Sequence, residues 1–118
     1  MSWMNSSQMA LLERFLDLSA MRQTLVSTNL ANVDTPGYHT RDLDFRGELQ
    51  RAMNGEDTGS TSPFVVPVRG LIARPDGNNV SVDRESMLLA EIQLQFKAAT
   101  SILRAEFSQL QTAIKEGP

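Results

Sequence analysis

Few residues of this chain carry side chains that commonly do chemistry. His39 is the only histidine, and the chain contains no cysteine. Disulfides, thiolate nucleophiles and cysteine-ligated zinc are therefore excluded. A catalytic triad or a histidine metal site would have to be built on His39 alone. The aspartates nearest to it in the sequence, Asp34, Asp42 and Asp44, are better explained as cap and turn residues. We therefore predict no catalytic residue, no cofactor and no metal site.

The composition narrows the class of protein further. With 118 residues, we expect a single domain over 1–118, and its 41% hydrophobic and 6% aromatic content allows only a small core. The 14 acidic residues outnumber the 11 basic ones, which disfavours nucleic-acid binding. No apolar run approaches the ~18 residues that span a membrane. Residues 1–5 contain no Lys or Arg before an apolar stretch, so we expect no cleaved signal peptide.

A long N-terminal helix is predicted over residues 6–32. Asn5 and Gln8 have the spacing of a capping box at its start. Pro36 disfavours helical dihedrals in the residue before it, so the helix has to end near Asn32. Apolar residues recur at helical steps of three and four; they are Leu11, Phe15, Leu18, Met21 and Leu25.

The middle of the chain, residues 33–82, is predicted to be irregular because it contains most of the glycines and prolines. Asp44 could cap a short helix over residues 45–53. Small polar residues at 56–62 are typical of a mobile loop. The run 64–68 (FVVPV) resembles a strand, but its proline makes it an edge strand or an extended arm.

A second long helix is predicted over residues 83–116, with Asp83 as its N-cap. Its apolar residues first follow a heptad seam and then continue after a one-residue change of phase; they are Leu89, Ile92, Phe96, Ala99 and Leu103, then Phe107, Leu110 and Ile114.

These elements predict a mainly α-helical fold, in which the two terminal helices form an antiparallel coiled-coil hairpin. Two helices alone leave much of each wide apolar face uncovered, and the middle segment can cover only part of it. Either the remainder packs on neighbouring subunits or another protein, or the chain is a self-contained bundle with its middle folded over the helices.

The most specific motif lies at the end of the first helix. Pro36 and Gly37 suit the two central positions of a type II turn, where glycine supplies the positive φ. The local turn does not explain the whole combination of residues. It resembles the signature A-N-x-x-T-P-G-Y of the flagellar rod, hook and hook–filament axial proteins. The matching residues, with the preceding asparagine, are Asn29, Ala31, Asn32, Thr35, Pro36, Gly37 and Tyr38.

Further runs are similar to the proximal rod proteins within that group. Arg22-Gln23 precedes the signature as in their first helix, and Thr40-Arg41-Asp42-Leu43-Asp44-Phe45 resembles their A-R-D-x-D-F run. Residues 76–85 resemble the segment that leads into their last helix, although Ser81 stands where the family often has Asp. The resemblance covers about 11–53 and 76–114.

The resemblance implies a structural subunit of the flagellar basal-body rod, not an enzyme. It implies export through the flagellar type III apparatus and a periplasmic location. The implied partners are other copies of the chain, other rod proteins, the rod-base adaptor and the membrane (MS) ring protein. Within this framework Asn29 and Asn32 would bind carbonyls at the helix end or reach a neighbouring subunit, and Tyr38 would lie at an interface. Arg41, Asp42, Asp44 and Arg46 would form ion pairs between subunits or remain solvated.

The alternative is a soluble helical adaptor or chaperone-like module that binds partner helices through the same apolar seams. Such an adaptor should purify as a stable monomer or small oligomer.

Overall fold

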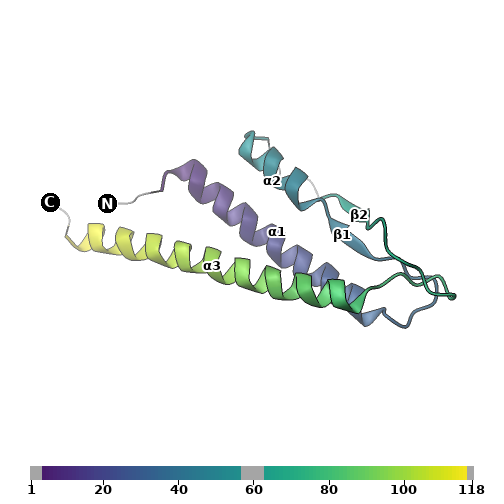
Figure 1. Cartoon of the computed structure of the whole chain (residues 1–118). Helices are drawn as coiled ribbons and strands as arrows, with labels where there is room; N and C mark the ends of the chain where they lie inside the picture. The colour runs from purple at the N-terminus through teal and green to yellow at the C-terminus, as the bar shows by residue number, and fades with distance from the viewer. Residues whose placement is uncertain (1–3, 57–62, 117–118) are drawn as a thin grey trace.

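The computed structural model describes residues 4–56 and 63–116 and is mainly helical (Figure 1). A long helix α1 (Ser6–Ala31) is followed by strand β1 (Arg41–Leu43) and a short helix α2 (Phe45–Met53). Strand β2 (Val65–Pro67) and a second long helix, α3 (Val82–Lys115), complete the chain. The predicted order of long helix, irregular middle with a short helix, and long helix is confirmed. Most of the segment 56–62, where a loop was expected, lies outside the described residues.

The caps of the first two helices are those that the sequence predicts. The Asn5 side chain accepts a hydrogen bond from the Gln8 amide, and the Gln8 side chain accepts one from the Asn5 amide. This capping box satisfies two amides that the helix itself leaves unpaired. In α2 the Asp44 carboxylate accepts a hydrogen bond from the Gly47 amide. Asn54 ends this helix, and Gly55 follows it with a φ of 76°.

Helix α3 begins one residue earlier than predicted, and Asp83 is not its cap. The Ser81 hydroxyl accepts a hydrogen bond from the Arg84 amide and caps the helix. Asp83 lies inside the first turn, where a negative charge also interacts favourably with the helix dipole. Both residues suit a helix start, so the sequence alone did not distinguish them.

The run at 64–68 supplies an edge strand, as one of its two predicted forms required. Strand β2 pairs antiparallel with β1, and Asp42 lies opposite Val66 in the register. Pro67 lies at the end of β2, where its missing backbone N–H does not interrupt the hydrogen bonding in the middle of the strand. Strand β1 was not predicted, because three residues are too short for an alternating pattern to be recognised.

Helix α1 is the central element of the molecule (Figure 1). It contacts α3 along one side, and α2 and β1 along another. The two long helices run antiparallel, so that both termini lie at the same end of the hairpin. The molecule measures 70 × 27 × 18 Å. Its radius of gyration is 18.2 Å, whereas a compact domain of this length would have about 13–14 Å. This elongated shape leaves a large surface in proportion to the volume.

The buried core is narrow and unusually polar. The buried apolar residues are Leu18, Val26, Leu43, Ile92 and Ala99. More polar than apolar residues are buried in the described chain; the polar ones are Ser19, Asn29, Thr40, Asp42, Glu48, Asn78, Asn79, Glu85 and Glu106. Along α3 the buried side chains recur at every seventh residue, and the first and last of the four are glutamates (Glu85, Ile92, Ala99 and Glu106). A core of this kind depends on hydrogen bonds as much as on apolar burial.

The predicted apolar seam of α3 is only partly buried in the single chain. Of the residues predicted to pack, Leu18 and Ile92 are buried, whereas Leu11, Phe15, Leu25, Leu89 and Leu103 are half-buried. Phe96, Phe107 and Leu110 are exposed, by 38%, 56% and 37%. These three residues therefore do not pack inside the hairpin of the single chain, because the buried line of α3 shares only Ile92 and Ala99 with the predicted seam. Their apolar surface remains available to neighbours.

Because Phe96 is exposed and Ile92 is buried, truncating the smaller Ile92 should destabilise the chain more than truncating the larger Phe96. In the isolated chain, Phe96→Ala should lower the free energy of unfolding by about 1 kcal/mol, well below the ~3–5 kcal/mol of a fully buried phenylalanine. Ile92→Ala should cost more, although isoleucine is smaller, because Ile92 is only 1% exposed. Urea unfolding followed by circular dichroism measures both. A larger loss for Phe96→Ala than for Ile92→Ala would contradict the packing described.

Candidate functional site

The chain leaves α1 through a tight turn formed by Thr35, Pro36, Gly37 and Tyr38. The Tyr38 amide donates to the Thr35 carbonyl at 3.2 Å, and Gly37 has a φ of 75°. Both observations match the predicted type II turn. The Gly37 amide also donates to the Asp76 carbonyl at 2.9 Å, so the turn is held against the segment that leads back to α3.

Replacement of Gly37 tests the turn directly. We expect Gly37→Val to lower the free energy of unfolding by about 2 kcal/mol, because a β-branched residue is strained at positive φ. A Cβ at Gly37 would meet no atom within 4 Å, so the cost comes from the backbone and not from a clash. Gly37→Asn should cost less, since asparagine tolerates this conformation. Equal stability of the two variants in urea unfolding would contradict the prediction.

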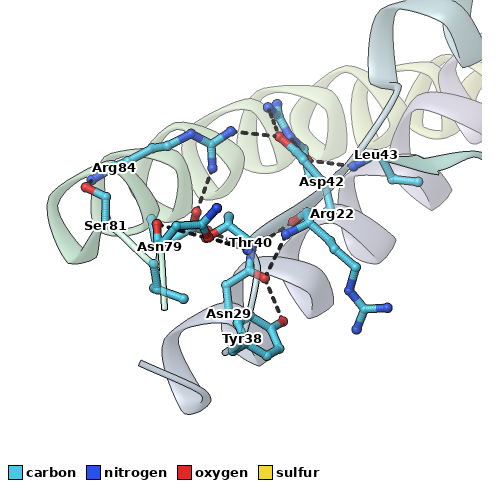
Figure 2. Close-up of polar contacts among 12 residues, drawn as sticks. Arg22, Asn29, Tyr38, Thr40, Asp42, Leu43, Asn79, Ser81 and Arg84 are labelled. Carbon is cyan, nitrogen blue, oxygen red and sulfur yellow. Dashed lines mark hydrogen bonds and ion pairs between the residues drawn. The ribbon is translucent and has the colours of Figure 1, made fainter. Parts of the chain in front are cut away.

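Asn29 is the centre of a polar network that joins three separate parts of the chain (Figure 2). Its amide nitrogen donates to the Arg41 carbonyl at 2.8 Å and to Glu85 Oε2 at 3.1 Å. Its side-chain oxygen accepts from the Tyr38 hydroxyl at 2.8 Å and from the Arg41 amide at 3.2 Å. Asn29 is 1% exposed, and Glu85 is fully buried. This single side chain therefore ties α1 to the turn, to β1 and to the first turn of α3.

Asp42 forms the second part of the network and lies between two arginines. Arg22 of α1 donates to its carboxylate through two nitrogens, at 2.9 and 3.0 Å. Arg84 of α3 donates at 3.2 Å, and a second Arg84 nitrogen donates to Glu85 at 2.6 Å. Figure 2 shows Asp42 between the two helices. Both expectations for Asp42, an ion pair between subunits or a solvated side chain, are therefore wrong, because its carboxylate is buried and paired within the chain.

The charged side chains of this cluster change each other's pKa values. Burial alone would raise the pKa of the Asp42 carboxyl, but the hydrogen bonds and charge of Arg22, the Leu43 amide and Arg84 together lower that pKa below its ordinary value. The same hydrogen bond from Arg22 to Asp42 raises the pKa of the Arg22 guanidinium. Both side chains therefore remain charged at neutral pH, which a bidentate pair requires.

Two asparagines before α3 connect it to the signature turn. The Asn78 side chain donates to the carbonyls of Asn32 and Thr35, at 2.8 Å each. The Asn79 side-chain oxygen accepts from the Thr40 amide at 2.7 Å. Asn78 is fully buried. The segment before α3 thus supplies a second donor to two carbonyls just after α1, which also accept from the Thr35 and Tyr38 amides.

Glu48 of α2 organises a third cluster, nearer the start of α1. It accepts from Arg14 of α1 at 3.4 Å, from the Phe64 amide at 3.0 Å and from Arg51. Burial raises the pKa of the Glu48 carboxyl, but the Phe64 amide and the two arginines outweigh burial and lower it below the ordinary value. Glu48 is 2% exposed. This cluster fixes α2 and the chain before β2 against α1.

The structure brings most of the predicted signature residues together inside the chain. Asn29, Asn32 and Tyr38 all form internal hydrogen bonds, and Asn32 bonds the Thr28 carbonyl at the helix end, as one of its two predicted roles required. Asp44 caps α2. Phe45 packs edge-on against Phe15 at 5.5 Å between ring centroids. The side chains that remain exposed are those of Ala31, Thr35, Pro36, Arg41, Asp44 and Arg46.

Sequence reasoning missed the partners of these residues. Glu85 and Asn78 lie near a helix start, and they were noted only within the run 76–85 that resembles a family segment. The signal that could have found Glu85 is its heptad spacing to Ile92, since an acidic residue at a buried seam position requires a partner. Arg22 was noted only as part of a resemblance, although it is the main partner of Asp42.

The arrangement of polar groups can hold the hairpin but offers no reactive group. His39 is exposed, and its Nδ1 lies 3.4 Å from the Asn79 amide nitrogen. Within residues 4–56 and 63–116, no three histidine or acidic side chains converge as they would at a metal ion. In the same residues no helix is long and apolar enough to cross a membrane. The network is an internal clamp that joins α1, β1 and α3 at the closed end of the hairpin.

At the open end of the hairpin, the surface is apolar instead of polar. A groove of about 420 Å³ lies among α1, α2 and α3. Apolar side chains make up nearly all of its lining, and they include Leu11, Leu12, Phe15, Leu49, Met53 and Ile102. The exposed Phe107 and Ile114 lie farther along α3. An apolar surface of this extent is typical of a protein that has partners.

Comparison with curated proteins gives a consistent result. The chain is 34% identical to the flagellar basal body rod protein FlgB of Escherichia coli K12 over 122 residues, which cover 86% of this chain and 88% of the relative. It is 31% identical to FlgB of Borrelia hermsii, over 89% of this chain and 93% of the relative. It is 34% identical to FlgB of Cereibacter sphaeroides, over 85% and 88%. No family model matches the chain.

These relatives come from different bacteria, and the matches cover 85–89% of this chain. The chain therefore belongs to the family of the flagellar basal body rod protein FlgB, and it is a structural subunit of the flagellar rod and not an enzyme.

Proposed function

We propose that this chain forms the proximal part of the rod as several copies, packed against each other and against other rod proteins through the open end of the hairpin. The single observation that carries the proposal is the uneven distribution of polar and apolar groups. The closed end is held by a hydrogen-bonded clamp, whereas large apolar side chains on α3 are uncovered. Phe107, Leu110 and Ile114 are exposed by 37–80%.

The clamp gives the assembly a rigid unit. Its buried ion pairs and hydrogen bonds fix the angle between α1 and α3. Most polar side chains of the signature thereby have their hydrogen-bond partners inside the chain. Neighbouring subunits can then cover the exposed apolar surface, whose burial supplies most of the free energy of association. The same division of roles accounts for the polar core of an elongated molecule. A soluble adaptor is not supported by the family assignment.

The other proposed partners are the rod-base adaptor, the MS ring protein and the flagellar type III export apparatus. We propose that the chain reaches the periplasm through this apparatus without cleavage of a signal peptide. This agrees with the absence of cysteine, since such a chain cannot form wrong disulfides when it crosses a membrane unfolded.

Deletion of the gene and electron microscopy of basal bodies test the proposed role. We expect membrane rings without rod or hook, and restoration of both when this chain is supplied. Intact rods and hooks in the deletion strain would contradict the role in the rod.

Export is tested separately by removal of residues 1–9. We expect the truncated chain to stay in the cytoplasm, since the resemblance places export information near the N-terminus. The full chain is the control, and equal amounts of both chains outside the cytoplasm would contradict this expectation.

A further inference from the structure

Helix α1 exposes only negative charge. Its two basic residues are already paired on the side that faces α2 and β1, Arg14 with Glu48 and Arg22 with Asp42. Glu13 and Asp17 are exposed, and neither forms an ion pair with any residue of the described chain. They are four residues apart and so lie one above the other on the same edge of the helix. We name these two residues the acidic edge.

The second half of α3 has the opposite character. From Ile92 to Lys115 its exposed charges are Lys97, Arg104 and Lys115, because Glu106 is buried. Lys97 and Arg104 also form no ion pair within the described residues. Together with Phe96 and Gln23 they line a shallow groove of about 340 Å³ between α1 and α3. We name Phe96, Lys97 and Arg104 the basic groove.

We propose that the acidic edge of one copy of this chain docks in the basic groove of a second copy. The observation behind the choice of a second copy is that one chain carries both complementary surfaces, each with its charges unpaired. The spacing also agrees: Glu13 and Asp17 are about 6 Å apart along α1, and Lys97 and Arg104 about 10 Å apart along α3, a difference that flexible lysine and arginine side chains accommodate. Phe96 adds exposed apolar surface beside the charges.

The form of this contact suits an assembly that grows. The acidic edge and the basic groove are different surfaces, so a copy that uses its edge on one neighbour keeps its groove for the next. Such heterologous contacts repeat into rings or helical arrays. The inference rests on the proposed self-assembly and adds the surfaces through which it occurs.

Disulfide cross-linking in assembled basal bodies tests the contact. Because the natural chain has no cysteine, only the introduced cysteines of this chain can take part. One chain carries Asp17→Cys, and a second, tagged chain expressed with it carries Arg104→Cys. Any disulfide between the two then joins separate copies. The matched control replaces Arg104→Cys with Gln50→Cys, an exposed position on α2. We expect the Arg104→Cys pair to give about tenfold more mixed dimer than the control, because docking would place positions 17 and 104 of two copies beside each other while Glu13 and Lys97 keep one attractive charge pair.

Charge reversal provides a second test that a folding defect cannot imitate. Glu13→Lys with Asp17→Lys, or Lys97→Glu with Arg104→Glu, should each reduce swimming motility. All four changes in one chain should restore it, because the attraction returns with its sign inverted.

Equal cross-linking of the Arg104→Cys and Gln50→Cys pairs, adducts to a chain of different mass in place of the mixed dimer, or no rescue by the fourfold variant would each overturn the inference. The proposed rod function would survive these results, because it fails only if rods form without the chain.

Discussion

Replacing Asn29 with alanine is expected to lower the free energy of unfolding by about 3 kcal/mol, although the change removes only a few atoms. The Asn29 side chain makes four hydrogen bonds in a buried position, to Tyr38, to both backbone groups of Arg41 and to Glu85. Its loss leaves Glu85 Oε2 and a backbone carbonyl buried without that donor. Leaving a buried polar group unsatisfied costs about 1–3 kcal/mol, and more when the group is charged.

Two further variants make this prediction specific. Asn29→Asp keeps the size of the side chain but replaces the donor with a second carboxylate next to Glu85, so it should be at least as destabilising as alanine. Thr28→Ala is the control, because Thr28 is half-buried and bonds only within its own helix. Urea unfolding of the full chain measures all three. If Asn29→Ala unfolds at the same urea concentration as Thr28→Ala, the clamp does not hold the hairpin together.

The second large effect is expected at Asp42. Asp42→Ala removes the shared partner of Arg22 and Arg84 and the acceptor of the Leu43 amide. Removing one partner of a buried ion pair costs about 3–5 kcal/mol, because the other charge stays unpaired. Since both arginines retain some contact with water, we expect the lower end, about 3 kcal/mol. Asp34→Ala is the matched control on an exposed aspartate.

The lowered pKa of Asp42 also predicts how the stability of the chain depends on pH. The folded chain lowers the pKa of Asp42, so the unfolded chain binds the proton more tightly than the folded one. The stability that Asp42 contributes is therefore fully present above its unfolded pKa of about 4 and is lost as the pH falls toward the lower folded pKa. Glu48 acts in the same direction. Unfolding measured from pH 7 to pH 3 should show a flatter acid branch for Asp42→Ala than for the wild type. Identical slopes would mean that Asp42 has an unperturbed pKa in the folded chain.

Local patterns predicted the helices well because their causes are local. The capping box of Asn5 and Gln8, the cap at Asp44 and the glycine turn at 35–38 depend on residues a few positions apart. Each of them therefore leaves a signature in a short stretch of sequence.

The clamp could not be predicted in the same way, because its contacts join distant residues. Asn29 and Glu85 are 56 positions apart, and Arg84 and Asp42 are 42 apart. The signature motif was recognised, but the sequence did not decide whether its asparagines bond within the chain or reach a neighbouring subunit. The seam of α3 was only partly correct for a related reason: a wide apolar stripe does not reveal which of its positions face the one partner helix present.

A cryo-electron microscopy map of isolated basal bodies at side-chain resolution tests the proposed assembly most directly. We expect several copies of this chain at the base of the rod, each with the hydrogen bond from Asn29 to Glu85 intact. We also expect neighbouring subunits to cover Phe96, Phe107 and Ile114, which are exposed in the single chain. A rod that lacks this chain, or one in which these three side chains still face solvent, would contradict the proposed assembly.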